Sequence, residues 1–166
     1  MELAGLDNAE AILQLQYTAY QSEAALYDDP HIPPLTQTLA QLHAEFATHT
    51  ILKATSDGQL VGSVRAQYIA GTAYIGRLIV EPSRQGQGIG SRLMAAIEST
   101  MAPVTRYELF TGDRSIRNIA LYQRLGYQPI RQVHLNERVT LIYLEKVGSL
   151  GAEVPSLTVG LPVAQE

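Results

Sequence analysis

Apolar residues recur every three or four positions in the first part of the chain, which is the period of one face of an α-helix. Asp7 or Asn8 can cap this helix at its start, and we expect it to run to about Leu26. Three prolines lie within residues 28–34 and end it, because proline lacks the backbone N–H that a helix interior uses. The apolar positions of this helix are Ile12, Leu13, Tyr17, Tyr20, Ala24 and Tyr27.

A second helix is expected from about Leu35 to Phe46. Thr38 and Gln41 have the spacing of a capping box, in which each side chain accepts a hydrogen bond from the other residue's backbone N–H. The apolar stripe of this helix is formed by Leu35, Leu39, Leu42 and Phe46.

The apolar pattern then changes to that of β-strands. Residues 50–55 and 60–69 predict two strands, joined by a tight turn at residues 56–59. An Asp-Gly pair at the centre of this turn readily adopts the positive φ angles of a short hairpin. Residues 71–72 make another turn into a strand over residues 73–80. Three strands with such short connections imply an antiparallel meander.

The second half of the chain alternates between helices and strands. Ser115 can cap one of these helices, and Gly126 suits the left-handed position that follows a helix end. The elements expected, in order, are a helix over residues 88–101, a strand over 107–111, a helix over 115–125, and an antiparallel pair over 127–133 and 139–145.

Composition and charge restrict the class of protein. The 166 residues suit one domain, which we expect over residues 1–146, followed by a tail or packing arm over residues 147–166. The absence of cysteine excludes a disulfide scaffold, a thiolate metal site and a cysteine nucleophile. The net charge of −4, with scattered basic residues, argues against nucleic acid as a partner. We expect a soluble, cytoplasmic domain without a membrane partner, because no apolar run or signal sequence is present.

The segment from Leu78 to Gly90 carries the clearest chemical signal. It has the pattern of a strand, a glycine-rich turn and a helix N-terminus. Such a turn can direct several backbone N–H groups to one point, and the helix dipole adds about half a positive charge there. This arrangement is a site for phosphate oxygens.

Other glycine-loop classes fit this segment less well. A P-loop needs a Gly-Lys-Ser/Thr ending, which Gly90-Ser91-Arg92 lacks. A dinucleotide-binding fingerprint has a different final spacing and opens a βαβ unit. On spacing alone, the remaining alternative is an ordinary strand-to-helix loop whose glycines allow close packing.

Two motifs resemble those of the GCN5-related N-acetyltransferases. Gln85-x-x-Gly88-x-Gly90 resembles the family's Arg/Gln-x-x-Gly-x-Gly/Ala signature, and the strand before it resembles the family's fourth strand. Residues 118–127 resemble a second motif of the family, which contains Asn, Ala and Tyr and ends in Gly-Phe/Tyr. Here these positions are Asn118, Ala120, Tyr122, Gly126 and Tyr127. The order of elements over about residues 1–146 also resembles this family. The resemblance implies an α/β fold, α+β in connectivity, with a central mixed, mostly antiparallel sheet of six or seven strands and helices on both faces.

The resemblance also implies acetyl-coenzyme A as co-substrate, with no metal. Backbone amides of residues 85–90 would hold the pyrophosphate, and the backbone of residues 78–80 would pair with the pantetheine as if it were an added strand. Ser91 would add a hydroxyl and Arg84 a positive charge. The residues implied in coenzyme binding are Leu78, Ile79, Val80, Arg84, Gln85, Gly86, Gln87, Gly88, Ile89, Gly90, Ser91 and Asn118.

The resemblance further implies Tyr122 as the proton donor to the departing thiolate. Ser115, Asn118 and Tyr122 share one helix face, and a backbone N–H of residues 78–80 would stabilise the oxyanion. A half-buried core tyrosine is the alternative for Tyr122. Glu81 is the candidate general base because it is the nearest carboxylate in sequence. Its alternatives are a cap carboxylate and a water molecule that carries the proton to solvent.

The expected acceptor is a primary amine of a small molecule or of a protein or peptide. Aromatic positions of the first helix can line its site, although ordinary core and surface roles are the alternative. A coenzyme-binding or sensing module without transferase activity is the second functional hypothesis, and a tRNA-modifying transferase fits the charge poorly. The tail and the last strand edges are compatible with a homodimer. The candidate acceptor-site residues are Tyr17, Tyr20, Glu23, Tyr27, His31 and His43.

Overall fold

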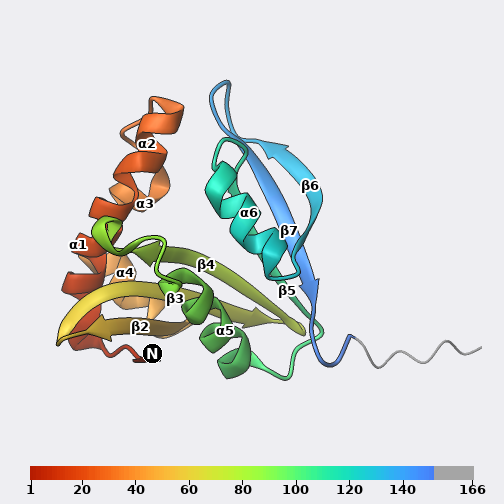
Figure 1. The fold of residues 1–166 in the computed structure, drawn as a ribbon, viewed down its shortest axis with the longest axis horizontal. Helices are drawn as coiled ribbons and strands as arrows, with labels where there is room; N and C mark the ends of the chain where they lie inside the picture. The colour runs from red at the N-terminus through yellow and green to blue at the C-terminus, as the bar shows by residue number, and fades with distance from the viewer. Residues whose placement is uncertain (152–166) are drawn as a thin grey trace, which may run out of the picture.

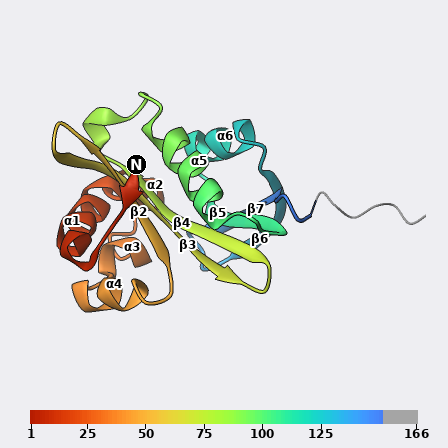
Figure 2. The same cartoon turned by 90° about the horizontal axis from the view of Figure 1, so that it is seen from below.

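The protein is built on one seven-stranded sheet with the strand order β1-β2-β3-β4-β5-β7-β6 (Figure 1). It is represented by a computed structural model that describes residues 1–151. Strands β4 and β5 are parallel, and the other neighbouring pairs are antiparallel. Helices cover both faces of the sheet, with α1, α3 and α4 on one side and α5 and α6 on the other (Figure 2). The fold class predicted from the sequence is therefore confirmed.

The elements follow the predicted order, with an additional short strand at the start of the chain. Their bounds are β1 Glu2–Leu3, η1 Leu6–Asn8, α1 Ala9–Ala19, α2 Gln21–Tyr27, α3 Pro33–Thr36, α4 Leu39–Glu45, β2 Thr50–Ser56, β3 Gln59–Ile69, β4 Thr72–Val80, η2 Pro82–Arg84, α5 Ile89–Met101, β5 Arg106–Gly112, α6 Ile116–Arg124, β6 Gln128–His134 and β7 Thr140–Val147.

The first predicted helix is interrupted, and this prediction was wrong in one respect. Tyr20 has φ −84° and ψ 0°, at the edge of the helical region, and it separates α1 from α2. The side chains of α2 bond to residues far along the chain, since the Tyr27 hydroxyl contacts Asp113 and accepts a hydrogen bond from the Arg114 N–H at 2.8 Å. These long-range bonds set the direction of α2, which helical periodicity alone does not reveal.

In place of the second predicted helix, the structure has two shorter helices, α3 and α4. The capping box is confirmed, because the Gln41 N–H donates to Thr38 Oγ1 at 3.2 Å and the Thr38 N–H donates to Gln41 Oε1 at 2.9 Å. The helix that this box begins is α4, so the predicted start at Leu35 was wrong. Pro33 and Pro34 form the first turn of α3, where a missing N–H costs no helical hydrogen bond.

The meander of β2, β3 and β4 is confirmed, and it contains one irregularity. Opposite Ser63 and Arg65 of β3 lie Ile79 and Gly76 of β4, so β4 has one extra residue in this interval. Arg77 lies within this bulge and has a left-handed φ of 49°. A bulge bends its strand and re-aims the side chains beside it.

Strands β4 and β5 diverge after a short paired region. Their register contains Thr72 with Arg106, Ala73 with Tyr107 and Tyr74 with Glu108, and no later pair within the described chain. Ile79 and Val80 of β4 therefore pair with β3, and none of residues 78–80 pairs with β5. This divergence opens the sheet at its centre, and Figure 1 shows the two halves spreading apart above the shared base.

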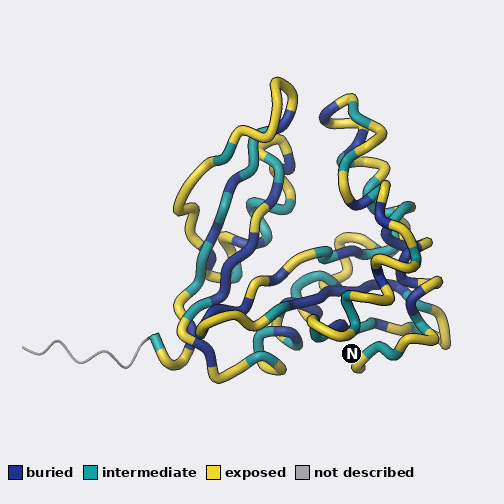
Figure 3. Tube along the Cα trace, turned by 180° about the vertical axis from the view of Figure 1, so that it is seen from behind, coloured by how far each residue is buried: buried dark blue, intermediate teal, exposed yellow. Residues whose placement is uncertain are grey.

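Separate apolar clusters stabilise the two faces of the sheet. One cluster packs α5 against β3 and β4, and Leu93, Met94 and Ile97 in it are fully buried. The other cluster packs α1 and α4 against β2 through Ile12 and Leu42. Figure 3 shows that the buried positions follow the strands and the inner sides of the helices, while the loops are exposed.

The first residues of the predicted tail belong to the packed structure. Strand β7 continues to Val147, the Gly148 N–H donates to the Thr105 carbonyl at 2.8 Å, and the Leu150 N–H donates to the Val104 carbonyl at 3.0 Å. The rest of the predicted tail, residues 152–166, lies outside the described residues. The predicted domain boundary after residue 146 stays a prediction.

Candidate active site

The predicted phosphate-binding loop lies at the N-terminus of α5. Gly86 and Gly88 have φ angles of 78° and 81°, which residues with a Cβ rarely adopt. A Cβ built at either glycine would have no neighbouring atom within 4 Å, so these two glycines serve backbone conformation rather than close packing. Within α5, the Arg92 N–H donates to the Gly88 carbonyl and closes the first turn. The backbone N–H groups of residues 89–91 come before this bond, so they are available to a ligand.

Strand β4 leads into this loop along its unpaired side. Because β5 has diverged, the backbone of residues 78–80 faces the opening in the sheet. An unpaired strand edge of this kind can hydrogen-bond an extended ligand. The loop and the strand edge are continuous, as the sequence predicts for a coenzyme with a diphosphate and an extended arm.

Glu81 occupies the junction between strand and loop and has a local role. Its carboxylate accepts hydrogen bonds from the Ser83 N–H at 2.7 Å and from the Ser83 hydroxyl, and it thereby caps η2. This geometry favours the cap interpretation of Glu81 over the general base.

Helix α6 lies across the opening from α2, and Glu23 joins them (Figure 1). The Ser115 hydroxyl donates to the Glu23 carboxylate, and Asn118 Nδ2 donates to Glu23 Oε1 at 3.4 Å. Ser115 occupies the N-cap position of α6, as predicted, but its side chain makes no cap hydrogen bond to the helix. Its hydroxyl instead holds the Glu23 carboxylate between α2 and the start of α6.

Tyr122 lies one turn beyond Asn118 on α6. It is 7% exposed and packs edge-to-face on Tyr127, with 6.1 Å between the ring centroids. Burial raises the pKa of the Tyr122 hydroxyl above its usual range, and the nearby Tyr20 and Glu23 side chains raise it further. Within residues 1–151 this hydroxyl has no hydrogen-bond partner, so it is a protonated donor that a ligand can engage.

The other candidate acceptor-site residues divide into two groups. The Tyr17 hydroxyl bonds the Gln37 carbonyl and Tyr27 fixes α2 to Arg114, so both tyrosines have structural contacts. His31 and His43 are exposed, and neither ring bonds a site residue among those the structure describes. Of the three predicted tyrosines, Tyr20 alone is associated with Tyr122 and Glu23.

Arg77 is a site residue that sequence reasoning missed. Its guanidinium lies 5.9 Å from the centroid of the Tyr20 ring. Burial raises the pKa of Tyr20, and the positive charges of Arg77 and Arg65 lower it in part. No motif indicates Arg77, because its position depends on the bulge in β4.

No group of three or more His, Asp or Glu side chains within residues 1–151 is arranged to hold a metal ion. No helix in the same part of the chain has the length and apolar character needed to span a membrane.

An opened central sheet, a glycine loop at a helix N-terminus and a buried tyrosine together define an acetyltransferase-like site. The sequence model of the acetyltransferase (GNAT) family matches residues 9–127. The chain therefore belongs to this family, and the enzyme class predicted from the sequence, an acetyl-CoA-dependent N-acetyltransferase, is confirmed at the level of the family. No curated protein sequence matches the chain.

Solved structures agree in fold over most of the chain. Smu.2055 from Streptococcus mutans UA159 is 12% identical and has a TM-score of 0.75, with 88% of this chain and 97% of that chain covered. PaiA N-acetyltransferase from Thermoplasma acidophilum, in complex with coenzyme A, is 16% identical with a TM-score of 0.71, covering 89% and 99%. The ribosomal-protein-S18-alanine N-acetyltransferase from Escherichia coli is 17% identical with a TM-score of 0.72, covering 93% and 96%.

Proposed function

We propose that this protein transfers the acetyl group of acetyl-CoA to a primary amine of a small molecule or of a protein terminus. The observation that carries the proposal is the continuity of three features. The free amides of the α5 N-terminus continue from the unpaired edge of β4, and Tyr122 of α6 belongs to the apolar cluster on which Leu78 and Val80 of that edge pack. The complex of PaiA with coenzyme A supports the choice of ligand.

In this proposal the coenzyme follows the route predicted from the sequence. The Gln85 N–H already donates to the Pro82 carbonyl at 3.4 Å, so the backbone amides of residues 86–90 bind the pyrophosphate. The backbone of residues 78–80 pairs with the pantetheine arm. Arg84 and Ser91, on either side of the glycines, add a positive charge and a hydroxyl. The diphosphate carries negative charge, which the dipole of α5 stabilises.

The transfer forms a C–N bond and breaks the C–S bond of the thioester. A backbone N–H of residues 78–80 donates to the oxyanion that develops on the carbonyl oxygen. The Tyr122 hydroxyl donates a proton to the departing coenzyme thiolate. The raised pKa of Tyr122 keeps the hydroxyl protonated but also makes it a weaker acid, so it serves first as a hydrogen-bond donor to the sulfur as the thiolate forms.

Glu23 is better placed than Glu81 to serve the amine. Its carboxylate lies between α2 and α6, held by the Ser115 hydroxyl, whereas the Glu81 carboxylate caps η2. A carboxylate there attracts a cationic amine and accepts the proton that the amine loses on acetylation, directly or through water. Asn118 holds Glu23 in this proposal and also lines the coenzyme side of α6.

The proposal is tested by mixing the full chain with acetyl-CoA and a panel of primary amines, and measuring thiol release and the acetylated product. Release of thiol together with product supports transfer. Saturable acetyl-CoA binding without turnover of any amine supports the coenzyme-binding module instead. Absence of acetyl-CoA binding contradicts both hypotheses.

Location, assembly and metal independence complete the proposal. We place the enzyme in the cytoplasm, where acetyl-CoA is its co-substrate, and we propose that it needs no metal. A homodimer is compatible with the free edge of β6 at one end of the sheet. Activity after chelator treatment and the mass in solution test the last two statements.

A further inference from the structure

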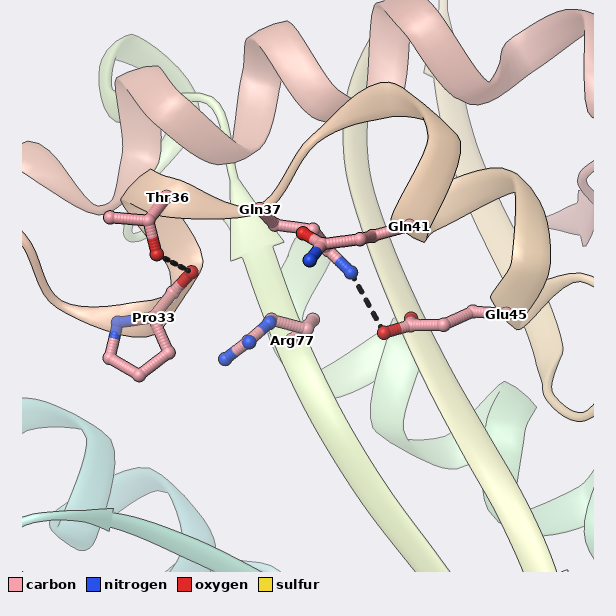
Figure 4. A pocket seen from close by; sticks show the side chains of 6 residues that line it. All are labelled: Pro33, Thr36, Gln37, Gln41, Glu45 and Arg77. Carbon is pink, nitrogen blue, oxygen red and sulfur yellow. Dashed lines mark hydrogen bonds between the residues drawn. The ribbon is translucent and has the colours of Figure 1, made fainter.

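A shallow, largely open cavity of about 430 Å³ lies between β4 and the helices α3 and α4 (Figure 4). Its volume is within the usual range for sites that bind small molecules. The residues that line it are Pro33, Thr36, Gln37, Gln41, Glu45 and Arg77. Figure 4 shows the Arg77 side chain extending across the cavity toward Pro33.

Arg77 reaches the cavity because of its backbone conformation. A left-handed φ of 49° is uncommon for a residue with a side chain, and Arg77 adopts it within the bulge of β4. Such conformations persist where the surrounding structure enforces them, and they are frequent at binding and catalytic sites. Here the bulge displaces a half-buried cation from the regular strand pattern into the cavity.

The charge of the cavity is positive. No ion pair among the described residues involves Arg77. Glu45 also lines the cavity, but its Oε2 pairs with Arg65 Nη1 at 2.7 Å and its Oε1 accepts from Gln37 Nε2 at 2.8 Å. Burial lowers the pKa of Arg65 to about 10, so Arg65 still neutralises Glu45 at neutral pH. Arg77 is therefore the uncompensated charge.

The cavity adjoins the proposed site of acetyl transfer. Tyr20 lies between them, since its ring is 5.9 Å from the Arg77 guanidinium and it begins the helical face that carries Glu23 three residues later. Glu23 in turn bonds Ser115 of the α6 region. The charges of Arg77 and Glu23 both act on the Tyr20 hydroxyl, since Arg77 lowers its pKa and Glu23 raises it.

We propose that the Arg77 cavity binds a carboxylate group of the acceptor, so that the substrate is a small primary amine that also carries a carboxylate. The inference rests on the proposed function. The carboxylate accepts hydrogen bonds from the Arg77 guanidinium, and the amine lies beyond Tyr20 at Glu23 and Tyr122. Opposite charges at the two ends give the acceptor one orientation and place its nitrogen toward the thioester.

A series of linear ω-amino acids of increasing length, each compared with the carboxamide of the same length, tests the inference. The wild-type enzyme is expected to use the best-fitting acid with a kcat/KM about 10-fold to 100-fold above that of its amide. This preference opposes intrinsic reactivity, because a nearby carboxylate raises the pKa of the amine and reduces its neutral, reactive fraction.

Arg77→Gln is expected to raise the KM of the acid to about that of the amide, with little change in kcat, because the lost contact holds substrate and transition state alike. Arg77→Lys is expected to retain part of the preference. Lys53→Gln removes a positive charge from β2 and is the matched control that keeps the full preference. As a readout without turnover, calorimetry with the N-acetylated acid and coenzyme A should show weaker binding to Arg77→Gln.

The outcomes separate the inference from the function on which it rests. A wild-type enzyme that acetylates acids and amides equally overturns the inference and leaves acetyl transfer in place. A preference for the acid that survives Arg77→Gln also overturns it. A wild-type chain that binds no acetyl-CoA and acetylates no amine contradicts the proposed function, and the inference falls with it.

Discussion

The Ser115 hydroxyl donates a hydrogen bond to the carboxylate of Glu23, although the two residues are 92 positions apart in the sequence. This contact joins α2 to the start of α6 across the opening between β4 and β5. Ser115 is 3% exposed, so the bond is shielded from water. Hydrogen bonds to a charged acceptor are stronger than neutral ones, and this one fixes the carboxylate between α2 and α6, where the proposed function places the amine.

The first prediction concerns Glu23. Glu23→Gln keeps an oxygen that accepts from Ser115 and removes the negative charge. We expect kcat/KM for the amine to fall about 100-fold at neutral pH, as for the loss of a general base, while acetyl-CoA affinity changes little. The control is Glu10→Gln, which alters an exposed carboxylate of α1. Wild-type kcat/KM in Glu23→Gln would leave water as the proton acceptor.

The second prediction concerns the Tyr122 hydroxyl. Tyr122→Phe keeps the ring and its packing on Tyr127, and we expect kcat to fall about 100-fold with nearly normal acetyl-CoA affinity. Since the pKa of Tyr122 is raised, its ionisation should cause no loss of wild-type kcat below about pH 10. Tyr68→Phe, at an exposed position, is the control. Altered stability with unchanged kcat, where chemistry limits the rate, would make Tyr122 a core residue only.

The third prediction concerns the glycine loop. Gly88→Glu places a negative charge beside the proposed phosphate site, and we expect it to abolish thermal stabilisation by acetyl-CoA. In the wild type this stabilisation is about 2.7 kcal/mol at a ligand concentration 100 times Kd. Gly88→Ala introduces the same unfavourable φ of 81° without a charge and is the matched control for strain. A folded Gly88→Glu protein with undiminished binding would refute the loop assignment.

The fourth prediction concerns stability at high pH. Burial raises the pKa of Tyr27 from 10.0 to about 12, so the folded state keeps the proton that the unfolded chain loses. Its contribution to stability is complete below pH 10 and is lost as the pH rises from 10 to 12. Tyr27→Phe should show a correspondingly shallower decline of the free energy of unfolding over this interval, measured with urea. Equal slopes for both proteins would contradict the burial of an un-ionised hydroxyl.

The fifth prediction concerns the end of the chain. Truncation after Gly151 should leave folding and acetyl-CoA binding intact, because no candidate site residue follows it. Truncation after Lys146 also removes the bonds from Gly148 to Thr105 and from Leu150 to Val104, and it should lower the melting temperature further. Loss of coenzyme binding in the folded chain that ends at Gly151 would contradict the prediction. Solution mass of both truncations tests whether residues 152–166 contribute to a dimer.

Features decided by neighbouring residues were predictable from the sequence. The hairpin at Asp57 and Gly58, the capping box of Thr38 and Gln41, and the loop around Gly88 all depend on backbone preferences within a few positions. Helix breaks were less predictable, because Tyr20 and Gln37 leave helical geometry while their neighbours bond to distant residues. Glu81 was chosen for its nearness in sequence, but a carboxylate two residues from a free Ser83 N–H bonds locally instead.

The sequence by itself determined the family, the order of strands and helices, and the glycine-rich segment proposed to bind phosphate, because motifs and periodic patterns are short-range properties. Only the tertiary structure decided which side chains share the opening in the sheet. The divergence of β4 and β5, the bulge that turns Arg77 into its cavity, and the approach of Glu23 to Ser115 arise from packing between distant segments. No local spacing encodes these contacts, since each depends on the path of the whole sheet.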